Sequence, residues 1–146
     1  MSLADYLPHG TSIVLIDEIL EFKQDYIKTK SIIKSDNKFL QDGKFEMYKS
    51  IEMMAQALGI YDSKMRELKG LKSGLGFLLG SRKFEMFQPF LSVGDEVVIE
   101  ARCSLQDEEG FGIYDCELYT DGKIAAKARL NVISPNDEFV QRIVNE

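Results

Sequence analysis

One carboxylate stands in a largely apolar stretch of the chain. Glu52 lies within IEMMAQALGI (51–60), directly between Ile51 and Met53. A carboxyl group enclosed by apolar side chains favours its neutral form, which can donate a proton. The simpler alternative is a glutamate in the first turns of a helix, stabilised by the helix dipole and pointing into solvent. Gln56 follows one turn later and could hold the Glu52 carboxyl in place, although structural polarity alone would also explain it.

The chain contains a single histidine and two cysteines. His9, in the segment LPHG, is a candidate general base, although a lone histidine in a Pro-Gly turn more often caps or packs. Cys103 and Cys116 lie in apolar alternating segments without Cys-x-x-Cys spacing. We therefore expect two buried, reduced thiols. We expect neither a metal nor another cofactor, because the sequence shows no ligand cluster and no phosphate-binding glycine loop.

The composition is typical of one globular domain. The chain has 146 residues, 45% of them hydrophobic, which suffices for a substantial core but is too short for two ordinary domains. We therefore expect a single domain, 1–146. No apolar run approaches the roughly 18 residues of a membrane-spanning helix, and the start does not resemble a signal peptide, so a cytoplasmic protein is expected. The net charge of −6 argues against nucleic-acid binding.

Two hydrophobic periodicities divide the chain. Residues 16–22 and 26–33 predict a first pair of strands. From about Phe45 to Leu68, apolar residues recur at steps of three and four, which predicts one long helix with a buried face. Gly70 is the expected C-terminal stop.

After the helix the period changes to two and remains so. Strands are predicted over 73–87, 96–105, 111–119 and 123–132. The turn TDGK (120–123) predicts a type I′ hairpin, because Asp and Gly tolerate positive φ. We expect these strands to form a four-stranded antiparallel meander. A sheet wrapped around one buried helix hides both apolar faces, so the expected fold class is α+β.

The order of motifs resembles the hotdog fold, and specifically 3-hydroxyacyl-[acyl-carrier-protein] dehydratases. The resemblance runs from about Tyr6 to Val132 and rests on YLPHGTSIVLIDEILEF, IEMMAQALGI, LLGSRKFEMFQPFLSVGDEVVIEA and DGKIAAKARLNV. The strings GFLLGSRKFE, SLQDEEGFG and ARLNVISP resemble the divergent branch associated with aryl polyene biosynthesis. The resemblance implies a long central helix wrapped by an antiparallel sheet. It also implies at least a dimer, because each site in the family combines residues of two subunits.

The resemblance implies dehydration of a 3-hydroxyacyl thioester on acyl carrier protein to the trans-2-enoyl thioester, in fatty-acid-like or aryl polyene biosynthesis. Such a reaction needs a base for the α-proton and an acid for the departing hydroxyl. In the resembled enzymes a histidine and the central-helix acid fill these roles, and backbone N–H groups near the helix N-terminus polarise the carbonyl. Glu52 matches the acid. Further candidates for substrate contact are Gln56, Gly76, Phe77, Leu78 and Gly80, of which the apolar pair could equally be core and the glycines strand bulges.

One part of the family pattern is missing. The resembled enzymes carry their histidine in a Gly-His-Phe-Pro loop, whereas the matching region SDNKFLQDGKFEMYK contains none. Three alternatives follow: His9 is a displaced base, a second hotdog subunit supplies the histidine, or the chain binds acyl carriers without catalysis. A hotdog thioesterase, with Glu52 as general base, is a further alternative. The partner is accordingly a second copy or another hotdog subunit.

A cluster of basic residues could bind the acidic surface of a carrier protein bearing the acyl-phosphopantetheine substrate. It begins at the end of the predicted helix and continues into the next predicted strand. The alternative is an ordinary solvated helix end. The predicted docking residues are Lys64, Arg66, Lys69, Lys72, Arg82 and Lys83.

Overall fold

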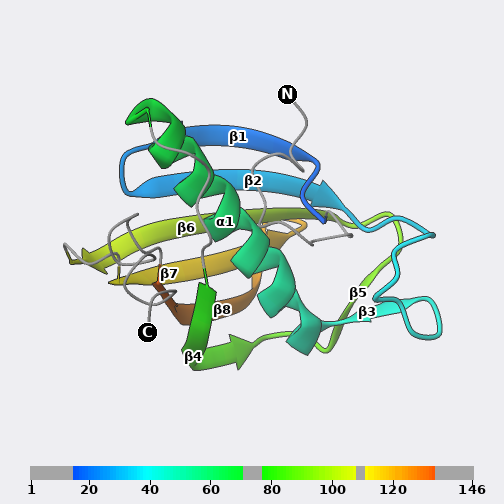
Figure 1. Cartoon of the computed structure of the whole chain (residues 1–146). Helices are drawn as coiled ribbons and strands as arrows, with labels where there is room; N and C mark the ends of the chain where they lie inside the picture. Colours follow the sequence, from blue (N-terminus) through cyan, green and yellow to red (C-terminus); the bar gives the residue numbers. More distant parts are fainter. Residues whose placement is uncertain (1–14, 71–76, 108–110, 134–146) are drawn as a thin grey trace, which may run out of the picture.

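The computed structural model describes residues 15–70, 77–107 and 111–133. In these residues a long helix, α1 (Ser50–Leu68), crosses one face of a six-stranded antiparallel sheet, as Figure 1 shows. The strand order in this sheet is β1-β2-β6-β7-β8-β4. Its strands are β1 (Glu18–Lys23), β2 (Tyr26–Ile32), β4 (Phe77–Met86), β6 (Glu96–Gln106), β7 (Phe111–Thr120) and β8 (Lys123–Ile133).

The pairing of β4 differs from the predicted meander. β6, β7 and β8 do form a meander, but β4 pairs with β8, through Arg82 opposite Arg129, instead of pairing with β6. β2 occupies the other side of β6 and brings the first hairpin into the same sheet. The prediction was wrong here because consecutive strands need not be neighbours, and only long-range packing decides the order. As a result, β1 and β4 are the two edges of the sheet.

The helix begins later than predicted. Phe45 lies in a short strand, β3 (Lys44–Glu46), which pairs with β5 (Phe90–Ser92), and a single turn of 3-10 helix, η2 (Met47–Lys49), precedes α1. Phe45 and Met47 are both fully buried, so they continue the apolar spacing without being part of α1. The spacing alone could not separate a buried strand residue from a buried helix residue.

Two predicted chain reversals are confirmed. α1 ends at Leu68, and Gly70 has a φ of 74°, the left-handed conformation expected of a helix stop. In the β7–β8 hairpin, Asp121 and Gly122 have φ values of 53° and 73°, as the type I′ turn requires. Both reversals depend on local conformational preference, which is why the sequence predicts them.

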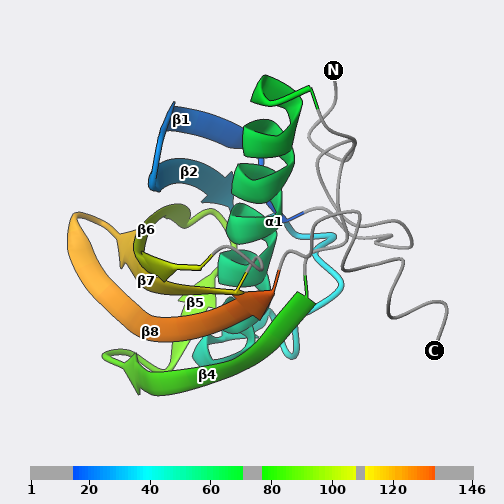
Figure 2. The ribbon, with the colours of Figure 1, turned by 60° about the vertical axis from the view of Figure 1, so that its left-hand side comes forward.

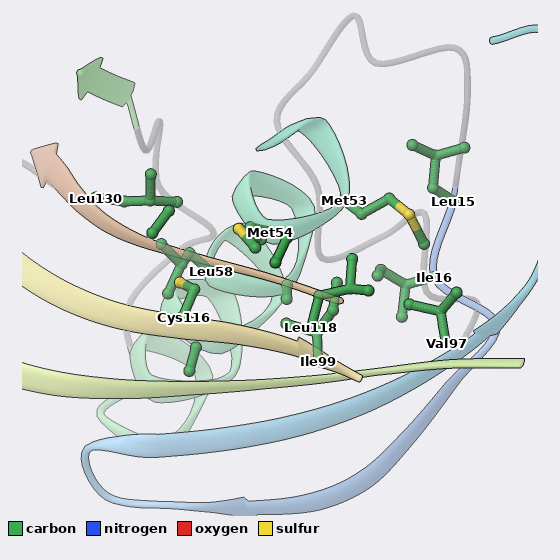
Figure 3. Close-up of a cluster of buried hydrophobic side chains, with 14 of the residues drawn as sticks. Leu15, Ile16, Met53, Met54, Leu58, Val97, Ile99, Cys116, Leu118 and Leu130 are labelled. Carbon is green, nitrogen blue, oxygen red and sulfur yellow. The ribbon is translucent and has the colours of Figure 1, made fainter. Parts of the chain in front are cut away.

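The core lies between α1 and the face of the sheet that the helix covers (Figure 2). Met54 and Leu58 of the helix point toward the strands that carry Ile99 and Leu118 (Figure 3). Buried and half-buried residues alternate along β7, and the half-buried set on the opposite face of the sheet includes Asp115 and Glu117. No helix within the described residues is long and apolar enough to cross a membrane.

The central position of Leu118 leads to a stability prediction. Its side chain is 0% exposed, whereas that of Leu105 is 56% exposed. We expect Leu118→Ala to lower the free energy of unfolding by about 3 kcal/mol, because it removes buried methyl groups and leaves a cavity. Leu105→Ala, the same chemical change at an exposed site, should cost less than about 0.5 kcal/mol. Urea unfolding of both variants tests this, and equal losses would contradict the assignment of the core.

Candidate active site

Glu52 lies in the first turn of α1 and its side chain is exposed in the single chain. Met53 and Met54, which follow it, are buried against the sheet. Successive helix residues differ in direction by about 100°, so the methionines turn inward while Glu52 remains outside. The expectation that these apolar neighbours enclose the carboxyl group is therefore wrong for the single chain. The exposure agrees with the simpler alternative of a solvated glutamate in a first helical turn.

Gln56 connects Glu52 to the segment that leads into β1. Its side chain is only 4% exposed, and its Oε1 accepts a hydrogen bond from the Leu15 N–H at 2.7 Å. Its Nε2 donates to Glu52 Oε1 at 3.4 Å, a longer and weaker bond. Both ends of the amide are thus used. Gln56 therefore bridges the Glu52 carboxyl group and the backbone N–H of Leu15.

Apolar packing supports the same connection. Leu15 and Ile16 are buried beside Met53, near the start of α1 (Figure 3). The role of Leu15 was missed in the sequence, because a backbone N–H bonded to a side chain 41 residues away leaves no local pattern. The segment entering β1 is therefore held against the helix by both a hydrogen bond and hydrophobic burial.

The N-terminus of α1 contains another polar group that the sequence did not indicate. Neither η2 nor α1 has a side-chain cap for its first backbone N–H groups. The Ser50 hydroxyl, at the first residue of α1, is buried and has no hydrogen-bond partner within the described part of the chain. The Met47 N–H donates to the Pro89 carbonyl at 2.9 Å and the Ser50 N–H to the Met47 carbonyl, so what this helix start offers an electron-rich group is the positive end of its dipole. Glu52 is two residues further along the same turn.

Several predicted site residues lie where side chains cannot be described. His9 and Gly76 are outside the described residues. The backbones of Phe77 and Leu78 pair with Ile133 and Val132 in β8. Between Leu78 and Gly80 the register with β8 shifts, which agrees with the strand-bulge alternative for Gly80.

The predicted docking residues do not form one surface in the single chain. Lys64 lies near β1, with its ammonium group 5.2 Å from the centre of the Phe22 ring. Arg66 is buried and pairs with Asp62 at 3.2 Å, so it contributes little exposed charge. Lys69 is exposed at the end of α1, and Lys72 is outside the described residues.

The remaining two docking candidates are on the other side of the molecule. Arg82 and Lys83 are exposed on β4, the edge of the sheet opposite β1. The separation arises because α1 crosses the sheet and ends beside β1 (Figure 1). The basic segment that is continuous in sequence is thus split between two edges.

The cysteines are unsuited to nucleophilic chemistry in the folded chain. Cys116 is buried and Cys103 is half-buried, and both are free thiols, so full burial is confirmed only for Cys116. Burial raises the pKa of both thiols, which disfavours the reactive thiolate. No group of three or more potential metal ligands occurs among the described residues.

The fold and this site define a class of proteins. An antiparallel sheet wrapped around one long helix is the arrangement of the hotdog fold. A family model described as "ApeP-like: ApeP dehydratase" matches residues 1–144. The chain belongs to this dehydratase family.

Solved structures agree with this assignment. The Dehydratase Heterocomplex ApeI:P from Xenorhabdus doucetiae matches with a TM-score of 0.86 and 28% identity, over 100% of this chain and 99% of that chain. A hypothetical thioesterase with coenzyme A from Streptococcus pneumoniae gives a TM-score of 0.65 at 13% identity, over 82% and 85% of the two chains. The E. coli PaaI protein from the phenylacetic acid degradation operon gives 0.63 at 14% identity, over 82% and 79%. The last two support the hotdog fold alone.

The buried amide of Gln56 leads to a second prediction. Gln56→Leu removes the acceptor of the Leu15 N–H, so we expect a loss of about 1–3 kcal/mol in unfolding free energy and faster hydrogen exchange of the Leu15 amide. The same substitution at the exposed Gln24 is the control. NMR-detected exchange and urea unfolding measure both effects. If Gln56→Leu behaves like Gln24→Leu, Gln56 does not hold this segment.

Proposed function

We propose that the protein removes water from a 3-hydroxyacyl group carried as a thioester on an acyl carrier protein, producing the trans-2-enoyl thioester. Membership of the ApeP-like dehydratase family supports dehydration as the reaction. The observation that supports Glu52 as part of the site is the pair of hydrogen bonds made by the Gln56 amide. These bonds join Glu52 to the segment preceding β1. The resemblance of GFLLGSRKFE, SLQDEEGFG and ARLNVISP to the aryl polyene branch supports an aryl-polyenoyl or similar chain as the substrate.

The same link supports His9 as the base. His9 is six residues before Leu15, so the extended chain keeps their Cα atoms within about 20 Å of each other. Leu15 is itself bonded to the amide that contacts Glu52. Because His9 is the single histidine of the chain, it is the imidazole available without a partner. We therefore propose that His9 removes the α-proton and that Glu52 protonates the departing hydroxyl.

The proposed step balances within the substrate and these two groups. His9 takes the proton from the α-carbon, the electrons of that C–H bond form the new C=C bond, and the C–O bond at the β-carbon breaks. Glu52 in its protonated form gives its proton to the departing hydroxyl, which leaves as water. The positive end of the α1 dipole would stabilise the negative charge that develops on the thioester oxygen. The proton on His9 then returns to Glu52, directly or through solvent.

A second subunit would complete the site. Glu52 is exposed in the single chain, whereas proton transfer of this kind is more effective where water is excluded. We propose that a hotdog partner covers this face of α1. The name of the Xenorhabdus doucetiae structure describes a heterocomplex of dehydratases, which supports a non-identical partner for this chain as well.

The chemical assignment is tested by following a 3-hydroxyacyl carrier substrate by mass spectrometry. We expect Glu52→Gln and His9→Ala each to reduce the rate of water loss by about 100-fold or more, the usual contribution of one general acid or base. Glu67→Gln, an exposed glutamate on the same helix, should leave the rate unchanged. If Glu52→Gln loses activity and His9→Ala does not, His9 is not the base, and a histidine of a partner subunit would have that role.

The same assay separates dehydration from the alternatives. Dehydration leaves the acyl group on the carrier and reduces its mass by one water, whereas a thioesterase releases the free carrier thiol. Carrier that is bound without either change would support a non-catalytic subunit. If purified wild type turns over neither alone nor with a hotdog partner, the proposed function is wrong.

We propose that the carrier protein docks at the C-terminal end of α1. Lys64 lies in the last turns of α1, and Lys69 is the residue that directly follows the helix. Reversing both charges (Lys64→Glu with Lys69→Glu) should weaken carrier binding about tenfold and flatten its salt dependence. The control reverses the exposed Lys38 and Lys123, which are not on α1. Equal affinity of the two double variants, measured by calorimetry at low salt, would rule out this docking surface.

A further inference from the structure

Exposed apolar side chains gather beside the start of α1. Tyr48, Met86 and Phe87 are 57%, 53% and 51% exposed, and all three line one groove. The other lining residues are Glu46, Gln88 and Pro89. Large exposed apolar side chains that adjoin one another mark a binding site, whereas isolated ones are ordinary on a protein surface. The groove is therefore a candidate ligand site, one that the sequence did not indicate.

Backbone contacts fix the walls of the groove. The Met47 N–H donates to the Pro89 carbonyl at 2.9 Å, and the Phe87 N–H donates to the Ala125 carbonyl at 2.8 Å. β3 and β5, which lie next to the groove, pair with each other. Figure 1 shows how β4 leads toward the start of α1 at this corner of the molecule. A groove with fixed walls needs little ordering when a ligand binds, which favours affinity.

The lining of the groove suits a flat, apolar ligand. It contains two aromatic rings, a thioether and a proline ring. Its charged member, Glu46, is paired with Lys49 at 3.5 Å, so that charge is compensated. The volume of about 490 Å³ lies within the usual range of small-molecule sites. Because aromatic rings pack well against other planar π-systems, a conjugated chain fits this lining better than a flexible saturated chain does.

The groove and the proposed carrier-docking surface lie on opposite sides of Glu52 along the helix. Lys64 follows Glu52 by about 18 Å along the helix axis, whereas Tyr48 precedes it by roughly 6 Å, or about one turn. A substrate whose carrier docks near Lys64 would place its 3-hydroxyl group at Glu52. The acyl chain beyond that hydroxyl would then continue toward Tyr48. The groove is therefore placed for the acyl chain and not for the carrier's arm.

We propose that the groove lined by Tyr48, Met86 and Phe87 binds the conjugated part of the acyl chain and makes the protein prefer conjugated over saturated substrates. The inference rests on the proposed function for the position of the reacting carbons, but the binding of a conjugated chain can be measured without it. The rings of Tyr48 and Phe87 supply the planar contacts, and the flexible thioether of Met86 adapts to the chain. Tyr48 and Phe87 are thus specificity-determining residues that take no part in proton transfer.

A fluorescent conjugated fatty acid tests the binding directly. The probe, trans-parinaric acid, contains conjugated double bonds, and its fluorescence rises when it enters an apolar site. We expect it to bind the full chain, and Tyr48→Ala and Phe87→Ala each to raise the dissociation constant about tenfold. Tyr48→Phe keeps the ring and should bind as tightly as wild type. Leu105→Ala removes an exposed apolar side chain on β6 and is the control, for which we expect no change.

A kinetic comparison tests the specificity. Two 3-hydroxyacyl carrier substrates of equal length would be compared by kcat/KM, one saturated and one conjugated beyond the 3-hydroxyl carbon. Tyr48→Ala should reduce kcat/KM about tenfold for the conjugated substrate and less than about twofold for the saturated one. Glu52→Gln should reduce both values by the same factor, because proton transfer at the 3-hydroxyl group does not depend on the rest of the chain.

Each opposite result would overturn the proposal. Equal binding of the probe by wild type and Tyr48→Ala shows that the groove does not hold the chain. Stearic acid, a saturated competitor, that displaces the probe equally well from wild type and Tyr48→Ala shows that conjugation is not recognised. Loss of a partner subunit in Tyr48→Ala, seen by native mass spectrometry, assigns the groove to a subunit interface, and loss of carrier binding alone assigns it to the carrier.

The two proposals can fail separately. Binding of the fatty acid uses neither a carrier nor turnover, so it can succeed in a protein that does not dehydrate, and that outcome would contradict the proposed function alone. Dehydration that shows no preference for conjugated chains, together with unchanged probe binding in the variants, would contradict the groove assignment and leave the proposed function in place.

Discussion

The burial of one face of α1 against the sheet is the constraint on which the candidate site depends. Met53, Met54 and Leu58 occupy the buried face, and their packing fixes the rotation of the helix about its axis. Once this rotation is fixed, Glu52 must face outward, and Gln56 lies where its amide can reach both Glu52 and Leu15. A hydrophobic interaction without directional preference thereby positions the polar groups. The packing of the core, and not a dedicated loop, therefore determines the geometry of the site.

This arrangement explains how the chain could function without the histidine loop of related dehydratases. The segment that enters β1 is held to the helix at Leu15, through a hydrogen bond and buried apolar contacts. In the proposed function the base belongs to the residues that precede this anchor point, and His9 is the residue proposed for it. The second subunit of the proposed function would cover the exposed side of Glu52.

Local rules in the sequence predicted much of the fold but little of the connection between elements. Gly70 and the Asp121–Gly122 turn were predictable, because a left-handed backbone limits which residues can occupy it. The start of α1 was not, since buried Phe45 and Met47 continue the same apolar spacing. The position of β4 beside β8 and the bond between Leu15 and Gln56 join residues far apart in sequence. Glu52 was found as a candidate, but its exposure depends on packing that no motif records.

The central claim is that His9 and Glu52 act together in one proton-transfer step, and a double-variant cycle tests it most directly. The kcat/KM for dehydration would be measured for wild type, Glu52→Gln, His9→Ala and the double variant, each in its active assembly. We predict that the double variant loses about as much activity as the more severe single variant, because either substitution alone disables the shared step. Losses that multiply would show that the two groups act independently, which would contradict this account of the site.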